Sequence, residues 1–99
     1  HAQVPCGGVQ IHVLDRHAFR PVLAAAAAIR EFHVESPADF AWRPPPYEYE
    51  YEKMPIDILA GSPAFRAQVE AHVDPRDMAA SWADGERAFC RLRQRFLLY

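Results

Sequence analysis

The repeat of apolar positions changes along the chain, from every second residue to every third or fourth. Within residues 8–14 apolar and polar side chains alternate from Val9 to Val13, and Val9, Ile11 and Val13 fall on the same face. Because strand side chains point alternately to two faces, this pattern predicts a β-strand with these three residues in the core. Gly7 and Gly8 predict a turn that leads into the strand.

Helical spacing begins at Pro21, a residue that suits the first position of a helix. The first predicted helix runs to about His33 along an apolar stripe of Val22, Ala25, Ala26, Ile29 and Phe32. Three more helices are predicted, at residues 55–61, 62–72 and 74–95, because a proline stands near the start of each and Gly61 stands at the end of the first. Gly85 in the last helix indicates a bend or the close approach of another backbone, and we expect the apolar tail, residues 96–99, to be packed.

The segment between the first two helices has a different pattern. Residues 40–43 alternate like a short strand before Pro44, Pro45 and Pro46 stop it. Residues 47–52 alternate tyrosine and glutamate, which favours an edge strand with a solvated acidic face. The alternative is that Tyr47, Tyr49 and Tyr51 line a groove for a sugar or a peptide, since such rings stack on apolar faces.

These elements predict one α+β domain, with a small β-sheet packed mainly on one face by helices and a long C-terminal helix. The 99 residues are 51% hydrophobic, enough for one core and against wholesale disorder. The net charge of −2 is scattered without a basic run, which argues against a nucleic-acid surface. No apolar stretch approaches the roughly 20 residues that span a bilayer.

The two cysteines indicate little chemistry. Cys6 and Cys90 are far apart in sequence and can be bridged only if the fold brings them together, so we expect free, mostly buried thiols. There is no Cys-x-x-Cys and no paired Cys/His spacing, so the sequence predicts no metal site and no cofactor.

The strongest candidate site lies around the end of the first predicted strand. Gln10 and His12 share the face opposite the apolar one, and Asp15 and Arg20 follow before the helix. Together these four residues could hydrogen-bond a polyhydroxylated or carboxylated ligand, with Arg20 forking onto a carboxylate. The alternative for His12 is a hydrogen-bonded structural residue. No nucleophile elbow, phosphate loop or His-Glu-x-x-His is present, and we assign no catalytic residue.

Four sequence segments carry a family resemblance. They are Cys-Gly-Gly-Val-Gln-Ile-His-Val-x-Asp-Arg from Cys6, Phe-Arg-Pro-Val from Phe19, Ile-Asp-Ile-Leu-x-Gly-Ser from Ile56, and the ending Arg-Phe-Leu-Leu-Tyr. In this order they resemble the C-terminal domain of the exo-β-N-acetylmuramidases, bacterial glycosidases of peptidoglycan salvage that remove N-acetylmuramic acid from non-reducing ends. The likeness covers nearly the whole chain, and it departs from the family pattern at the triple proline and at Gly85.

The resemblance implies that residues 1–99 are an accessory domain of a longer glycosidase. In that family a larger Rossmann-like domain comes first and supplies the catalytic acid, and the active cleft lies between the two domains. It further implies an exported protein, a peptidoglycan sugar as ligand, and a chain inactive without its catalytic domain. Arg20 or His12 would hold the lactyl carboxylate, unless Arg20 pairs with Asp15 or a helix-end acid. A stand-alone carbohydrate-binding module and a structural or dimerising domain remain as alternatives.

Overall fold

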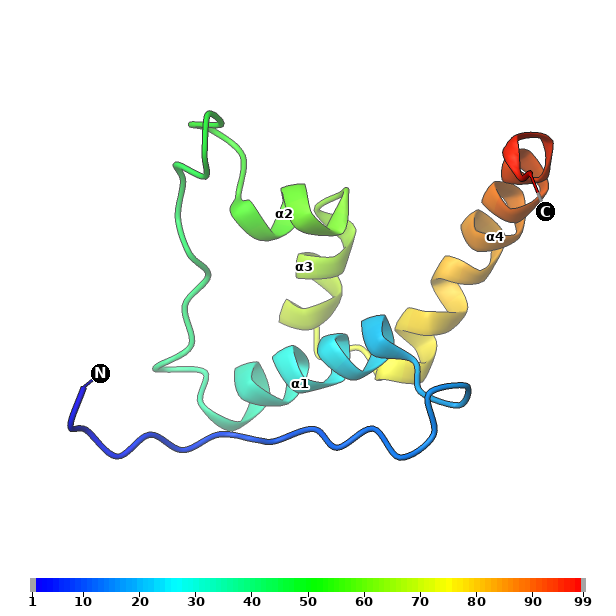
Figure 1. The fold of residues 1–99 in the computed structure, drawn as a ribbon. Coiled ribbons are helices and arrows are strands. Elements are labelled where there is room, and N and C mark those ends of the chain that lie inside the picture. Colours follow the sequence, from blue (N-terminus) through cyan, green and yellow to red (C-terminus); the bar gives the residue numbers. More distant parts are fainter. Residues whose placement is uncertain (1, 99) are drawn as a thin grey trace.

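The protein is an open arrangement of helices with a long extended segment at its start (Figure 1). The computed structural model describes residues 2–98. Within this range it contains α1 (Pro21–Glu35), α2 (Pro55–Ala60), α3 (Ala64–Glu70), α4 (Pro75–Arg93) and the 3₁₀ turn η1 (Gln94–Phe96). No sheet forms among these residues, and the one β-bridge is an isolated pair, Tyr47 with Glu50. The predicted α+β fold with a small sheet is therefore wrong.

The helices begin and end close to where the sequence predicted. Proline opens α1, α2 and α4, because its missing N–H has no partner in the first turn of a helix. Gly61 ends α2 with a positive φ of 80°. This left-handed region is unfavourable for residues that carry a Cβ. The Asp74 carboxylate accepts a hydrogen bond of 2.8 Å from the Arg76 backbone N–H and so caps α4.

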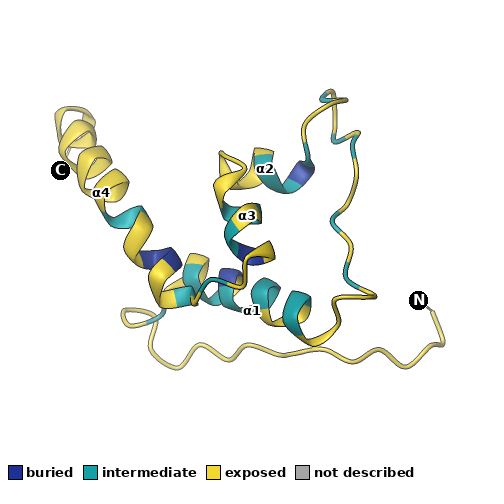
Figure 2. Ribbon diagram, turned by 180° about the vertical axis from the view of Figure 1, so that it is seen from behind, coloured by how far each residue is buried: buried dark blue, intermediate teal, exposed yellow. Residues whose placement is uncertain are grey.

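A small core lies where α1, α3 and the first half of α4 meet. Ala26, Val69 and Met78, one from each helix, are buried there (Figure 2). Five half-buried side chains surround them: Ile29, Trp42, Phe65, Val73 and Trp82. The stripe predicted for α1 is therefore confirmed at Ala26 and Ile29, whereas its members Val22, Ala25 and Phe32 are exposed.

The predicted first strand is wrong. Residues 8–13 run along the extended segment before α1 (Figure 1) and Leu14 forms a bend, but within the described range no backbone hydrogen bond joins residues 8–14 to another segment. The face expected in the core is exposed, at 69% for Val9, 55% for Ile11 and 48% for Val13. A strand needs a neighbouring strand to satisfy its backbone, and the described residues offer none. The predicted glycine turn is also wrong, since the turn lies earlier, around Gln3.

Neither of the other two expected strands forms. In place of the strand at residues 40–43, Phe40 and Trp42 pack edge to face, and the Trp42 indole N–H donates to Glu70 Oε1 at 3.0 Å. The tyrosine-glutamate segment folds into a tight turn, closed by backbone hydrogen bonds of 2.9 and 3.0 Å between Tyr47 and Glu50. Long-range packing and turn formation thus override the alternating patterns.

The C-terminal half of α4 projects away from the other helices (Figure 1). The helix runs through Gly85 without a break, and apart from its own turn of helix no described atom lies within 4 Å of where a Cβ would stand there. The expected close backbone approach is therefore wrong. Phe96, Leu97 and Leu98 are exposed, which also contradicts the packed tail, and Tyr99 lies outside the described residues.

The molecule exposes more surface than a compact protein of its mass. Its accessible area is 8484 Å², whereas a folded monomer of this size exposes about 5,700 Å². Its radius of gyration is 16.5 Å, against about 13 Å for a compact domain. Both thiols are free, as expected, but exposed rather than buried. The described chain therefore leaves much apolar surface uncovered.

Candidate functional site

Asp15 shapes the connection between the extended segment and α1. Its Oδ1 accepts hydrogen bonds from the backbone N–H groups of His17 at 2.8 Å and Ala18 at 3.3 Å. Its carbonyl oxygen accepts a third from the Phe19 N–H at 3.0 Å. One residue thus closes the turn at residues 15–19, a use that suits aspartate because its short side chain reaches its own following backbone.

Arg20 stands at the N-terminal boundary of α1 and borders a hollow of about 290 Å³. Trp82 and Glu86 of α4 line the opposite side of this hollow. Arg20 forms no ion pair with Asp15 or any other acid in the described part of the chain. Its guanidinium is therefore available to a ligand, as the carboxylate-binding prediction requires.

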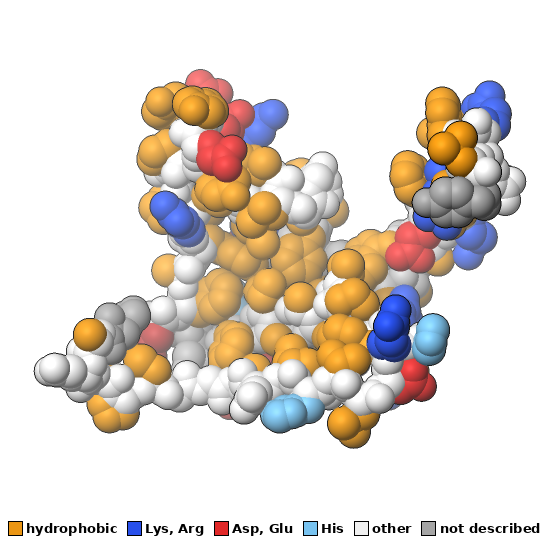
Figure 3. Space-filling model, viewed as in Figure 1, with side chains coloured by type: hydrophobic (Ala, Val, Ile, Leu, Met, Phe, Trp, Pro, Cys, Tyr) orange, Lys and Arg blue, Asp and Glu red, His pale blue; other side chains and the backbone are white. Residues whose placement is uncertain are grey.

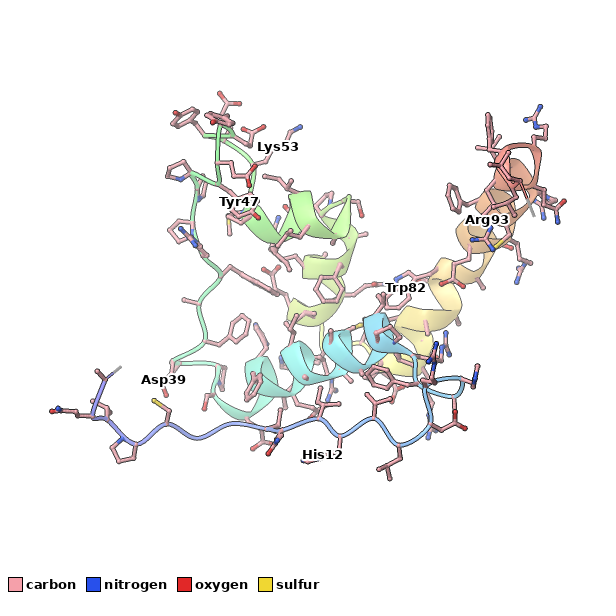
Figure 4. The ribbon with its side chains drawn as sticks, in the orientation of Figure 1. His12, Asp39, Tyr47, Lys53, Trp82 and Arg93 are labelled. Carbon is pink, nitrogen blue, oxygen red and sulfur yellow. The ribbon has the colours of Figure 1, made fainter. Side chains whose placement is uncertain are left out.

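Gln10 and His12 remain on the extended segment, both exposed. Figure 4 shows His12 on that segment and Trp82 at the junction of α1 with α4. The structure therefore groups Arg20 with Trp82 and Glu86 in one hollow, and leaves Gln10 and His12 outside its lining.

A larger apolar cleft continues from the Arg20 hollow. Its volume is about 470 Å³, and it shares Val22, Trp82 and Glu86 with the smaller hollow. The rest of its lining is almost entirely aliphatic and aromatic: Ala25, Ala26, Ile29, Ile56, Leu59, Ala60 and Phe65. In Figure 3 this surface appears as a hydrophobic hollow between the α2–α3 arm and α4. Such a lining suits the burial of apolar groups and offers one acid for polar recognition.

The third hollow, of about 720 Å³, lies beside α2, and charged as well as apolar residues line it. Across it Arg66 donates from Nε and Nη2 to the two carboxylate oxygens of Asp57, each at 2.9 Å. This paired hydrogen bond lowers the pKa of Asp57 and raises that of Arg66. Because each charge already has its partner, this pair holds α2 against α3 and leaves little free charge for a ligand.

Glu50 is likewise committed to the protein's own backbone. Its carboxylate accepts from the N–H groups of Glu52 at 2.9 Å and Lys53 at 3.3 Å, which lowers its pKa. Tyr49 and Tyr51 project from the same turn into solvent, and Tyr47 is half-buried. Tyr47 and His12 lie on opposite sides of the molecule in Figure 4, so the tyrosines belong to a different surface from the predicted site.

Two histidines meet in a contact that sequence reasoning missed. His33 Nδ1 of α1 lies 3.1 Å from His72 Nε2, although 39 residues separate them. Arg30 donates to the His72 carbonyl oxygen at 3.0 Å and places a cation beside the pair. Within residues 2–98 no three His, Cys, Asp or Glu side chains converge as metal ligands would.

Comparison with known proteins assigns the family. The model described as "Exo-beta-N-acetylmuramidase NamZ, C-terminal" matches residues 1–99. The chain belongs to this NamZ C-terminal family. The peptidoglycan β-N-acetylmuramidase NamZ of Bacillus subtilis (strain 168) is 26% identical over 99 residues, which is all of this chain and 22% of that relative. The chain thus spans about a fifth of the relative's length. No solved structure matches it.

The NamZ resemblance predicted from the sequence is confirmed, and the structure explains one of its motifs. The segment that begins at Ile56 forms α2 and the turn after it, with Asp57 bound to Arg66 and Gly61 in the left-handed region. The motif therefore holds two helices together. Among the described helices, none is both long and apolar enough to cross a bilayer.

Sequence reasoning did not associate Trp82 and Glu86 with Arg20. Trp82 is partly buried and packs against the core on its other side. Glu86 follows it by one helical turn, so the two residues share a side of α4. That spacing was the available signal, but the position of α1 beside α4 had to come from the structure.

Proposed function

We propose that this chain is the C-terminal, cleft-completing domain of a bacterial exo-β-N-acetylmuramidase. The parent enzyme would hydrolyse N-acetylmuramic acid from the non-reducing ends of peptidoglycan fragments, with a preceding Rossmann-like domain supplying the catalytic groups. The match of the NamZ C-terminal family to the whole chain carries this proposal. A peptidoglycan substrate in turn implies export, so we propose a periplasmic or extracellular enzyme.

Arg20 is the residue that we propose for substrate selectivity. N-acetylmuramic acid differs from N-acetylglucosamine by a lactyl carboxylate, and a planar guanidinium binds a carboxylate through two parallel hydrogen bonds. Arg20 supports this role because it borders a hollow and lacks an ion pair in the described part of the chain. Trp82, on the far side of the hollow, offers an aromatic edge to the sugar.

We propose lesser contacts for Gln10, His12 and Asp15. The exposed amide and imidazole can donate to sugar hydroxyl or acetamido oxygens. Asp15 uses Oδ1 to close its turn, so Oδ2 is the oxygen that a sugar hydroxyl would reach. These residues would form the side of the cleft that faces the catalytic domain.

The test compares Arg20→Met with Arg16→Met in the full-length enzyme. Arg16 is an exposed arginine four residues away that does not line the hollow, so its variant controls for lost charge. Nitrophenyl glycosides of N-acetylmuramic acid and N-acetylglucosamine are assayed in parallel. We expect Arg20→Met to lower kcat/KM on the muramic substrate about 10- to 100-fold and to narrow the preference over glucosamine, as for a lost charged hydrogen bond.

The control variant should keep both rates. Equal losses on both substrates with Arg20→Met, or no loss, would give Arg20 a structural role. Wild-type enzyme that releases no nitrophenol from the muramic substrate would contradict the proposed function itself.

A further inference from the structure

The segment before α1 runs extended (Figure 1), and the described residues contain no sheet that it could join. Within residues 2–98 no backbone hydrogen bond joins residues 8–14 to any other segment. A regular extended chain presents its N–H and C=O groups along both edges, ready to pair with another strand. Unpaired backbone groups together with exposed apolar side chains make this a surface suited to strand addition.

The two faces of this segment differ in chemistry. Val9, Ile11 and Val13 form an exposed apolar face, whereas the other face carries the polar Gln10 and His12 before Leu14 at its end. One-sided alternation is the pattern of a strand in a sheet that covers a core on one face and meets solvent on the other. The segment is therefore built for a sheet with one apolar side, and the chain itself contains no such sheet in its described range.

We propose that residues 8–14 pair as an added strand with a β-sheet in the polypeptide that precedes this domain in the longer enzyme. This inference rests on the proposed function. The matching family model describes a C-terminal part, and the Bacillus subtilis relative has 78% of its length outside the match, since the match covers 22%. The segment lies on the N-terminal side of α1, next to where such a polypeptide would join. The preceding polypeptide is therefore the partner that we propose for residues 8–14.

The proposed pairing would set the positions of the candidate site residues as well as the contact between the two domains. Val9, Ile11 and Val13 would pack against the core of the preceding domain, and Gln10 and His12 would lie on the outer face of the added strand, where they would line the cleft between the two domains. The turn closed by Asp15 ties the segment to α1, so docking the strand also sets the position of Arg20. Strand addition would thus explain why Asp15 and Arg20 follow directly after residues 8–14, a segment that pairs with no other strand among the described residues.

Hydrogen exchange on the full-length enzyme tests the pairing directly. We expect amides in residues 9–13 to exchange at least about 100-fold more slowly than in an unstructured peptide of the same sequence, because ladder hydrogen bonds protect them. Exchange at the unstructured rate would overturn the proposal. The measurement uses unmodified protein, so it does not depend on whether a variant folds.

Two matched substitutions test which face is covered. Ile11→Asp and Gln10→Asp introduce the same carboxylate at adjacent exposed positions. In the full-length enzyme we expect Ile11→Asp to lower the Tm by several degrees or to prevent folding, because it buries an unpaired charge. Gln10→Asp should shift the Tm little. Equal Tm values for the two variants would contradict the apolar docking face.

The exchange result and the enzyme's activity, taken together, distinguish a failure of this inference from a failure of the proposed function. Protected amides in an enzyme without muramidase activity would leave the strand pairing intact and remove the function. Free exchange in an active enzyme would do the reverse. Protection that disappears on dilution, with a dimer measured by light scattering, would make a second copy the partner and overturn the proposed occupant.

Discussion

The packed part of the molecule and its two ends handle their apolar surface differently. Between α1 and the first half of α4, apolar side chains from three helices meet, and Val69 and Met78 lose all exposure to solvent. At the ends, the apolar side chains of residues 8–14 and those of Phe89 and Leu92 in the second half of α4 remain exposed. Figure 2 shows the contrast as a short buried region between two exposed arms.

Backbone hydrogen bonding accounts for part of this difference. A helix satisfies its own N–H and C=O groups, so α4 can project into solvent as a helix without a partner. An extended segment cannot satisfy them and needs a second strand. The protruding half of α4 and the segment before α1 are therefore incomplete in different ways: the first lacks side-chain packing, and the second lacks both packing and backbone pairing.

The largest expected effect contrasts the two halves of α4. In the 99-residue chain Met78→Ala should cost about 2–5 kcal/mol of unfolding free energy, because it leaves a cavity in a fully buried site. Phe89→Ala removes a larger side chain that is 61% exposed, and should change stability by less than about 0.5 kcal/mol. Urea denaturation followed by helical circular dichroism measures both. A cost for Phe89→Ala near that of Met78→Ala would erase the contrast.

Substitution of two glycines tests the backbone of the packed part against that of the projecting part of α4. Gly61 in the packed part has φ = 80°, so Gly61→Ala should destabilise the chain by about 1 kcal/mol. Gly85 lies in the helical, projecting part of α4, with open space around it. Gly85→Ala should therefore stabilise the chain by about 1 kcal/mol. Thermal melts of both variants report the two signs, and a loss of stability at Gly85 would show that another backbone approaches it.

The fold could be predicted where local chemistry decides the structure. Helix starts at Pro21, Pro55 and Pro75 and the stop at Gly61 depend on neighbouring residues alone, and they were found. The sheet was predicted wrongly because alternation shows which face a strand would bury, without showing that a partner strand exists. The strand needs that partner, and the described chain does not contain it.

The candidate site was predictable to a similar extent. Asp15 and Arg20 attracted attention as charged residues between two elements, and the structure places both at the entry to α1. Trp82 and Glu86 line the same hollow as Arg20 although they are more than 60 residues away in sequence, and helix packing of this kind has no local signature. The His33–His72 pair escaped prediction for the same reason.

The smallest expected effect concerns two ion pairs, one in each part. Arg66 lowers the pKa of Asp57 below its ordinary value of 3.8, so the folded chain holds this carboxylate ionised more strongly than the unfolded chain does. The resulting stability is fully present above the ordinary pKa and is lost as the pH falls through the folded pKa. Asp57→Asn should therefore reduce the loss of stability between neutral and acidic pH.

The matched control is an exposed ion pair. Arg87 and Asp84 form such a pair on the projecting part of α4, and Asp84→Asn should leave the acid part of the stability profile unchanged. Melts at pH values between 2 and 6 compare the variants, and an equal reduction of the stability loss by both would show that the packed part gives its ion pair no advantage.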